Sequence, residues 1–216
     1  MAHWWGRDIM QKPLLLQIDS ADPFYHGMIE LHRERHQAYA QRHGYEYWVD
    51  PPPGDSSQWF RIETIKAALD DGYSHVFYLD ADACVADLSV DLRDAINHPT
   101  WIGLTVHPFG FGSNMQWHFN TGVIYMRNGP EAKTYVRDVL RFHGEAAWDQ
   151  EPMNELLMHV DVYQGGYRPL HQRWNQNMNH PASRHAPIVA AWHGDGTPLQ
   201  RLARMQRWER ENPWRK

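Results

Sequence analysis

The stretch Val76-Phe77-Tyr78-Leu79-Asp80-Ala81-Asp82 is an apolar run that ends in two carboxylates one residue apart. Such a run predicts a buried strand that delivers the carboxylates to its carboxyl end. Ligands of open α/β sheets bind at that edge. Residues two apart on a strand share a face, so Asp80 and Asp82 could hold one divalent cation. A cation held by two carboxylates completes its shell with water and substrate phosphates. The stretch therefore predicts a metal–phosphate site, with a simple turn cap as the alternative.

The sequence on both sides of this strand predicts its place in a sheet. Strands are expected at residues 14–19 and 45–49, and helices at 24–44 and 59–69, each by its periodicity and its terminal glycines or aspartates. The order β-α-β-α-β indicates an α/β fold with a mostly parallel central sheet flanked by helices. Asp19 ends the first strand and is therefore expected at the same edge as Asp80, as a donor contact.

The second half of the chain is less regular. We expect strands at residues 101–106, 122–126 and 187–192, and helices at 130–143 and 149–159. Thr197-Pro198-Leu199-Gln200 has capping-box spacing with proline at the first helical position, which predicts a final helix. No linker, repeat or low-complexity segment interrupts the sequence. One domain over residues 1–216 is expected, with 197–216 as a basic C-terminal helix or tail.

The composition is that of an ordinary globular protein. The 216 residues are 42% hydrophobic and 22% charged, with a net charge of −5, which disfavours wholesale electrostatic binding to nucleic acid. No apolar stretch reaches the roughly 18 residues of a membrane span, and the first residues lack a signal-peptide pattern. The single cysteine, Cys84, excludes an internal disulfide framework. We expect a cytoplasmic protein, bacterial or encoded by a phage.

Two polar motifs precede or begin regular elements in the second half. Asn120-Thr121-Gly122 leads into a strand, where an amide and a hydroxyl could bind sugar hydroxyls and a glycine allows close approach. A plain turn is the alternative. Asp149-Gln150 stands at a helix start, where a carboxylate could stabilise positive charge at an anomeric carbon or simply cap the helix.

Further candidates lie near strand ends or on a neighbouring helix. His193 follows a short apolar strand and could ligate a metal, and Gly194 and Gly196 could let backbone amides wrap a diphosphate. On the helix before the Asp-x-Asp strand, Arg61 is expected to face solvent. Lys66 could face either a phosphate or solvent.

Taken in order, these motifs resemble those of the GT-A glycosyltransferases. The resemblance is carried by Leu79-Asp80-Ala81-Asp82-Ala83, Phe119-Asn120-Thr121-Gly122, Asp149-Gln150 and His193-x-x-Gly196. Within that class the chain is similar to family 34, which contains galactomannan galactosyltransferases, xyloglucan xylosyltransferases and yeast mannosyltransferases. The resemblance spans residues 14 to 196.

The resemblance implies a fold, a donor and a set of roles. It implies transfer of a hexose or pentose from a nucleotide-diphosphate sugar, a UDP-sugar first and a GDP-sugar second, with retention of configuration and with Mn²⁺ or Mg²⁺. Asp80 and Asp82 match the motif that contacts the donor ribose and the metal, and His193 matches a later metal ligand. Asn120 and Asp149-Gln150 match residues near the transferred sugar, and the donor contacts also take in Asp19, Lys66, Thr121, Gly194 and Gly196.

Two rival functions remain open at this point. A haloacid-dehalogenase-like phosphatase or phosphotransferase also has a strand ending in Asp-x-Asp, with Asp80 as nucleophile. That motif usually opens its domain, whereas two β-α units come first here, and Cys84 stands where threonine or valine is expected. A non-catalytic sugar-binding relative is the other rival. Retention of both aspartates and of His193 argues against it.

The acceptor is a hydroxyl group that the motifs do not identify. The C-terminal stretch carries Arg201, Arg204 and Arg207 at helical spacing, with tryptophans interleaved. A solvated basic helix is the simplest interpretation. The alternative is a phosphate-rich acceptor, either membrane lipid or DNA with a hydroxymethylated base, in place of a glycan.

Overall fold

The structure is a computed structural model that describes residues 12–50, 58–97, 99–109, 116–179, 186–194 and 196–214. Its elements follow one another as β1 (Pro13–Ile18), α1 (Pro23–His43), β2 (Glu46–Asp50), α2 (Gln58–Asp70), β3 (His75–Leu79), β4 (Ala83–Val85), η1 (Leu92–Ala95), β5 (Ile102–Phe109), β6 (Gln116–Arg127), α3 (Pro130–Leu140), α4 (Gln150–His159), α5 (Asp161–Gln164), β7 (Tyr167–Leu170), η3 (Gln172–Asn175), β8 (Gln176–Asn177), β9 (Val189–Ala191) and α6 (Pro198–Glu211). The expected β-α-β-α-β order of the first half is confirmed.

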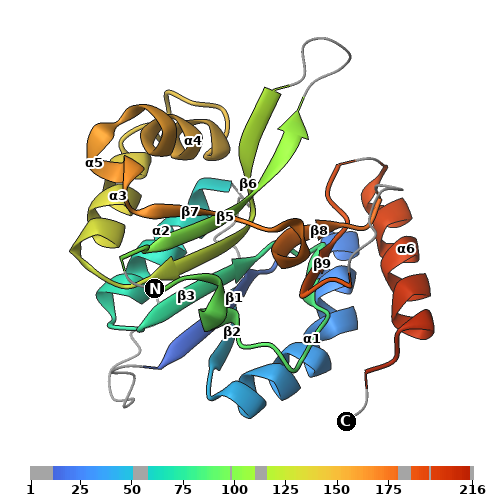
Figure 1. Cartoon of the computed structure of the whole chain (residues 1–216). Coiled ribbons are helices and arrows are strands. Elements are labelled where there is room, and N and C mark those ends of the chain that lie inside the picture. The colour runs from blue at the N-terminus through green and yellow to red at the C-terminus, as the bar shows by residue number, and fades with distance from the viewer. Residues whose placement is uncertain are drawn as a thin grey trace.

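A six-stranded sheet in the order β2-β1-β3-β6-β5-β7 forms the centre of the molecule (Figure 1). Strands β1, β2 and β3 run parallel, and β7 runs parallel to β5. Strand β6 is antiparallel to both of its neighbours, β3 and β5. The sheet is therefore mostly parallel and mixed, as expected for this α/β fold, and β7 is a strand that the sequence pattern did not indicate.

Helices cover both faces of this sheet because alternate strand residues point to opposite sides. Leu14 and Leu16 of β1 pack with α2, α3 and α4 on one face. Leu15, between them, packs with α1 and the β4 and β9 strands on the other. Each of these leucines is fully buried. A parallel strand buried on both faces reads as a continuous apolar run, as this one does.

Strand β6 begins earlier than predicted. This corrects the expectation that the Asn-Thr-Gly motif precedes the strand. Asn120 and Thr121 lie within the strand and not at its mouth. The β5–β6 register shifts here, since Gly103 pairs with Tyr125 but Thr105 pairs with Asn120. The extra residues on β6 bend the strand out of the sheet. A bulge next to a site re-aims side chains, which places this segment beside Asp80.

A second, three-stranded sheet in the order β4-β9-β8 continues directly from the Asp-x-Asp motif. Helix α6 begins at the predicted capping box, in which the Thr197 and Gln200 side chains bond reciprocally to backbone amides. It packs on α1, where the buried Arg35 donates two hydrogen bonds of 3.0 Å to Glu209. Within the described ranges, none of the helices combines the length and apolar composition that crossing a membrane requires.

Candidate functional site

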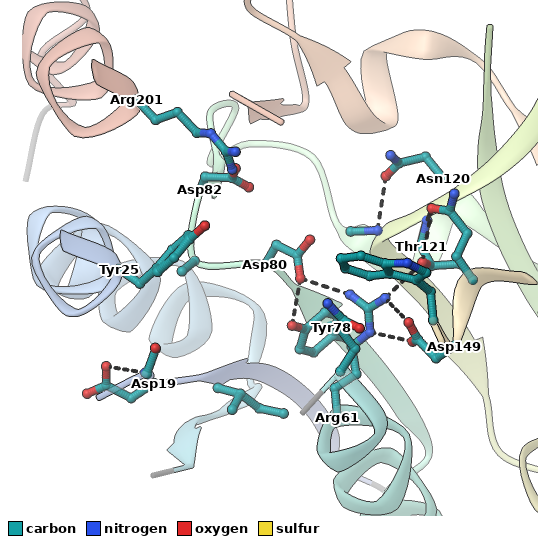
Figure 2. A pocket seen from close by; sticks show the side chains of 17 residues that line it. Asp19, Tyr25, Arg61, Tyr78, Asp80, Asp82, Asn120, Thr121, Asp149 and Arg201 are labelled. Atoms are coloured by element: carbon teal, nitrogen blue, oxygen red, sulfur yellow. Dashed lines mark hydrogen bonds and ion pairs between the residues drawn. The ribbon is translucent and has the colours of Figure 1, made fainter. Parts of the chain in front are cut away.

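A pocket of about 560 Å³ opens at the carboxyl ends of β1 and β3, the edge that the sequence predicted (Figure 2). Parallel strands direct their carboxyl ends to one edge of a sheet, so segments distant in sequence meet there. The lining residues come from the ends of β1 and β3, from α1, α2 and β6, from the start of α4 and from α6: Ile18, Asp19, Ser20, Tyr25, Gln58, Arg61, Tyr78, Asp80, Ala81, Asp82, Asn120, Thr121, Gly122, Trp148, Asp149, Gln150 and Arg201.

Asp80 occupies the middle of the pocket, between its two sides (Figure 2). Its Oδ1 accepts hydrogen bonds from Tyr78 Oη at 2.7 Å and from Arg61 Nη1 at 3.0 Å. Its Oδ2 approaches Gly122 so closely that a Cβ atom there would lie 2.6 Å away, which explains the glycine. Burial raises the pKa of Asp80 to about 6, against the opposing charge of Arg61 and with the help of the neighbouring Asp82.

Asp82 lies two residues after Asp80 and is paired with a different element. Only 4% of Asp82 is exposed, and its Oδ2 accepts a hydrogen bond of 2.9 Å from Arg201 Nη1 of α6. Burial raises the pKa of Asp82, and Arg201 opposes that shift. Its backbone oxygen accepts from the Trp192 amide at 2.9 Å, which brings the end of β9 beside the Asp-x-Asp motif.

Arg61 is buried in the wall of the pocket, so the expectation that it faces solvent is wrong. Its Nε and Nη2 each donate to one oxygen of Asp149 at 2.6 Å, and Nη2 also donates to Thr121 Oγ1 at 2.9 Å. Burial alone would lower the pKa of Arg61, but Asp149 and Asp80 hold it well above its ordinary value. Because its partners lie up to 88 residues away in sequence, local periodicity could not reveal this network.

Asp149 and the β6 motif form the far side of the pocket. Asp149 stands at the N-cap position of α4, but its side chain makes no capping hydrogen bond and pairs with Arg61 instead. Gln150 Oε1 accepts from both the amide and the hydroxyl of Thr121 at 3.3 Å. Asn120 Oδ1 accepts from the Gly122 amide at 3.0 Å and from Asn175 Nδ2 at 2.8 Å. The residues that the sequence placed near the sugar, Asn120, Thr121, Asp149 and Gln150, therefore lie together in the pocket.

The other predicted residues fall at varying distances from this centre. Asp19 lines the pocket, with its Oδ2 2.7 Å from His26 Nδ1. Lys66 does not line it; its Nζ pairs with Asp70 at 2.7 Å on the exposed side of α2. Lys66 therefore does not face this pocket, which corrects the expectation that it could contact a phosphate there. It sits five residues after Arg61 on α2, which points it to another side of the helix.

His193 and the glycines after it lie next to the pocket without lining it. His193 follows Trp192, and its Nε2 is 2.9 Å from Nδ1 of His107. Burial lowers the pKa of His193 to about 4, so its imidazole is neutral, the form that ligates metals. Gly194 and Gly196 have φ angles of 92° and 99°, a backbone conformation that favours glycine.

The charges in the pocket fit a divalent cation. Four lining carboxylates, from Asp19, Asp80, Asp82 and Asp149, face two guanidinium groups, so the described lining has two negative charges in excess. No three His, Cys, Asp or Glu side chains converge into a closed metal site within the described residues. Two carboxylates in an open cleft are the usual protein ligands of a cation that takes its remaining ligands from water and phosphates.

Comparison with solved structures shows which fold this is. A glycosyltransferase involved in the glycosylation of the major capsid of PBCV-1 matches over 91% of this chain and 99% of its own, with a TM-score of 0.67 and 18% identity. The glycosyltransferase GlyE of Streptococcus pneumoniae, in its apo form, matches over 94% of this chain and 64% of its own, at 0.56 and 15%. The chain has the GT-A glycosyltransferase fold.

A third GT-A match is the bifunctional glycosyltransferase WbbM, which covers 95% of this chain and 50% of its own, with a TM-score of 0.55 and 11% identity. No family model matches the chain. No curated protein matches it either. The similarity to family 34 therefore stays a prediction, while the GT-A fold that it implied is confirmed.

Sequence reasoning missed several residues that line the pocket of this GT-A fold. Arg201 was read as part of a basic stripe, but it enters the pocket and bonds Asp82. Its position in the first turn of the predicted helix, eight residues after His193, was the signal that could have placed it near the metal motif. Tyr25, Tyr78 and Trp148 carried no such signal, since aromatic residues fill cores as often as sites.

Proposed function

We propose that this chain is a metal-dependent glycosyltransferase that moves a hexose or pentose from a nucleotide-diphosphate sugar to a hydroxyl acceptor with retention of configuration. One observation carries the proposal: Asp80, Asp82, Asn120, Asp149 and Gln150 line one pocket at the ligand-binding edge of a GT-A fold. These are the residues that the family resemblance relates to donor, metal and transferred sugar. A UDP-sugar is the first candidate donor and a GDP-sugar the second.

The charge distribution of the pocket supports this assignment. Cleavage of a sugar–diphosphate bond leaves negative charge on the departing nucleotide and positive charge on the sugar. A bound Mn²⁺ or Mg²⁺ would neutralise charge on the diphosphate, with Asp80 and Asp82 as its carboxylate ligands and His193 next to them. At the sugar end, the carboxylate of Asp149 is 1% exposed and fixed by two bonds to Arg61. Together with Asp80 it gives two carboxylates against the one guanidinium of Arg61, and a fixed group with this excess negative charge can stabilise oxocarbenium-like charge without reorganising.

The remaining side chains suggest how the two substrates are arranged. Asp19, Ser20 and Tyr25 surround the β1 end of the pocket, a position suited to the nucleotide. Asn120, Thr121 and Gln150 offer hydrogen bonds to sugar hydroxyls at the other end. Trp148 is 56% exposed beside them, and its indole could stack on the acceptor.

For the acceptor we propose a glycan hydroxyl ahead of a hydroxymethylated DNA base. The basic stripe that motivated the DNA hypothesis is partly engaged in contacts within the protein. Arg201 bonds Asp82 in the pocket and Arg204 Nη1 bonds Asn179 Oδ1 at 2.6 Å. Arg207 is the member of the three that is exposed without such a bond among the described residues. Binding of duplex DNA at low salt tests the alternative directly.

The deciding experiment measures hydrolysis of UDP- and GDP-sugars with and without Mn²⁺. We expect turnover that requires the cation and falls about 100-fold in Asp82→Asn, in line with the loss of a metal-site group. Asp71→Asn, an exposed aspartate outside the pocket, is the matched control and should retain full activity. Metal-independent turnover or an active Asp82→Asn would contradict the proposal. Release of phosphate from a phosphomonoester would favour the dehalogenase-like rival.

A further inference from the structure

The guanidinium of Arg201 is only partly committed to protein partners. Its Nη1 donates to Asp82 Oδ2 at 2.9 Å, and its Nε makes a long bond of 3.4 Å to the backbone oxygen of Gly196. Within the described residues its Nη2 makes no hydrogen bond. The side chain is 19% exposed and lines the pocket. Arg201 thus holds Asp82 with one nitrogen and keeps further donors available.

The backbone that carries Arg201 is fixed, so any movement belongs to the side chain. Arg201 lies in the first turn of α6, where its amide donates to the Thr197 oxygen at 3.0 Å. The capping box holds this turn, and the far end of α6 is tied to α1 by Arg35 and Glu209. An arginine side chain has four rotatable bonds, so its guanidinium can leave Asp82 while the helix stays in place.

Asp82 is a nearly buried carboxylate that lines the pocket and already has a cationic partner. The carboxylate is 6% exposed, and Oδ2 is occupied by Arg201. A divalent cation bound to this carboxylate would meet the guanidinium at short range, and like charges a few ångströms apart repel each other strongly in a poorly solvated site. The cation and Arg201 are therefore competitors for the same carboxylate.

Once displaced, Arg201 remains in the pocket that would hold the donor. Its planar fork of donors suits phosphate oxygens in a bidentate arrangement. Arg61 cannot take this role, because its Nε, Nη1 and Nη2 are all bonded to Asp149, Asp80 and Thr121. Of the two arginines in the described lining, Arg201 is thus the one whose guanidinium can leave its protein partner and bind a substrate.

We propose that Arg201 is a built-in counter-ion of Asp82 that the divalent cation displaces and that then binds the diphosphate of the donor. This inference rests on the proposed function. It makes α6 part of the donor site. It also makes metal and nucleotide binding cooperative, because a diphosphate stabilises the conformation in which Arg201 has left Asp82, and coupling of this kind is reciprocal.

Arg201→Gln tests the inference through two affinities that should change in opposite directions. Isothermal titration calorimetry would measure binding of MnCl₂ alone, and then binding of UDP and GDP with Mn²⁺ present. We expect Mn²⁺ alone to bind about 10-fold more tightly, since its competitor is gone. We expect the nucleotide that binds the wild type to bind about 10-fold more weakly, since a charge-assisted bond is lost. A purely structural role would weaken both.

Two further variants complete the experiment. Arg207→Gln removes the same charge from an exposed position of the same helix and should change neither affinity. Arg201→Lys keeps a cation beside Asp82 but loses the fork, so Mn²⁺ binding should stay near that of the wild type while nucleotide binding weakens. This variant carries the test if Arg201→Gln does not fold.

The outcomes separate the inference from the proposed function. A wild-type protein that binds neither Mn²⁺ nor a nucleoside diphosphate would overturn both. A wild type that binds both, with affinities unchanged or lowered together in Arg201→Gln, would overturn the role of Arg201 and leave the glycosyltransferase proposal standing.

Discussion

Two arginine–aspartate groups lie on opposite sides of the same pocket and differ in how firmly they are held (Figure 2). Arg61 bonds both oxygens of Asp149 at 2.6 Å, and its side chain is 9% exposed. Arg201 bonds a single oxygen of Asp82 at 2.9 Å and is 19% exposed. The same pair of residue types therefore gives a fixed wall on one side and an exchangeable contact on the other.

Burial explains why the first group must stay together. A buried ion pair has lost its hydration, so removing one partner leaves an uncompensated charge in the protein interior. Asp149 is 1% exposed and relies on Arg61 for both oxygens. The Arg201 guanidinium keeps access to the pocket and its solvent, so its separation from Asp82 costs less. The comparison predicts a large difference in stability between equivalent mutations.

The largest effect is expected for Arg61→Met. The substitution keeps the unbranched apolar stem of the side chain but leaves Asp149 buried without its cation, which should destabilise the fold by about 3–5 kcal/mol. Arg201→Gln should cost less, about 1–3 kcal/mol, because it leaves the nearly buried Asp82 without its charged partner but beside a pocket that is open to solvent. Urea unfolding of both variants at pH 7 measures the two free energies of unfolding.

A second substitution separates charge from packing at this position. In Arg61→Met/Asp149→Leu the fully buried carboxylate is gone and only the half-buried Asp80 has lost a partner, so the double variant should recover part of the stability lost in Arg61→Met. Equal destabilisation by Arg61→Met and Arg201→Gln would remove the distinction between the two sides of the pocket.

A smaller effect is expected between the two groups, at Gly122. A Cβ atom at this residue would lie 2.6 Å from Asp80 Oδ2 and 3.2 Å from Asn120 Oδ1. Gly122→Ala should displace the Asp80 carboxylate, lower stability by about 2 kcal/mol and weaken Mn²⁺ binding. Gly165→Ala is the control, since a Cβ atom there has no neighbour within 4 Å. Unfolding and Mn²⁺ titration of both variants measure the effect, and equal Mn²⁺ affinity would show that Asp80 does not depend on this close approach.

The sequence predicted the sheet edge because local patterns determine it. The apolar run before Asp80, the helix that Gly44 ends with a φ of 73°, and the capping box at Thr197 are each decided within a few residues. The strand β7 was missed because only Leu170 among its four residues is buried, so no apolar run or clear alternation marks it. The length of β6 was missed because its bulge depends on pairing with β5 and β3.

The sequence predicted the site residues that directly follow strands. It did not predict the site residues that extend into the pocket from helices. Asp19, Asp80 and Asp82 follow strands, so the topology alone brings them together. Arg61 and Arg201 enter from helices, and their roles depend on partners 88 and 119 residues away. A buried arginine cannot be told from a solvated one by helical periodicity, because both stand on the polar side of an amphipathic pattern.

A third pair, Arg93 with Asp91, extends the comparison to the surface and has the smallest expected effect. Burial opposes ionisation of Asp91, but hydrogen bonds from Arg93, from Tyr45 and from the Arg93 amide outweigh it and lower the pKa of Asp91 to about 2. Asp91 is 22% exposed and Arg93 is 42% exposed. After allowance for solvent screening, the pair should contribute about 1–2 kcal/mol to stability.

The sign of this contribution fixes its pH dependence. The pKa of Asp91 is lower in the folded protein than in the unfolded chain, where it is about 3.9, so the stabilisation is complete above about pH 4. It is lost as the pH falls through about 2. The difference in free energy of unfolding between wild type and Asp91→Asn should therefore be about 1–2 kcal/mol at pH 6 and shrink towards zero near pH 2. Asparagine keeps an oxygen for the Tyr45 hydroxyl and the Arg93 amide, so the variant removes mainly the charge. Urea unfolding across this range measures the difference, and a difference that does not vary with pH would assign the stabilisation to hydrogen bonding and not to the ion pair.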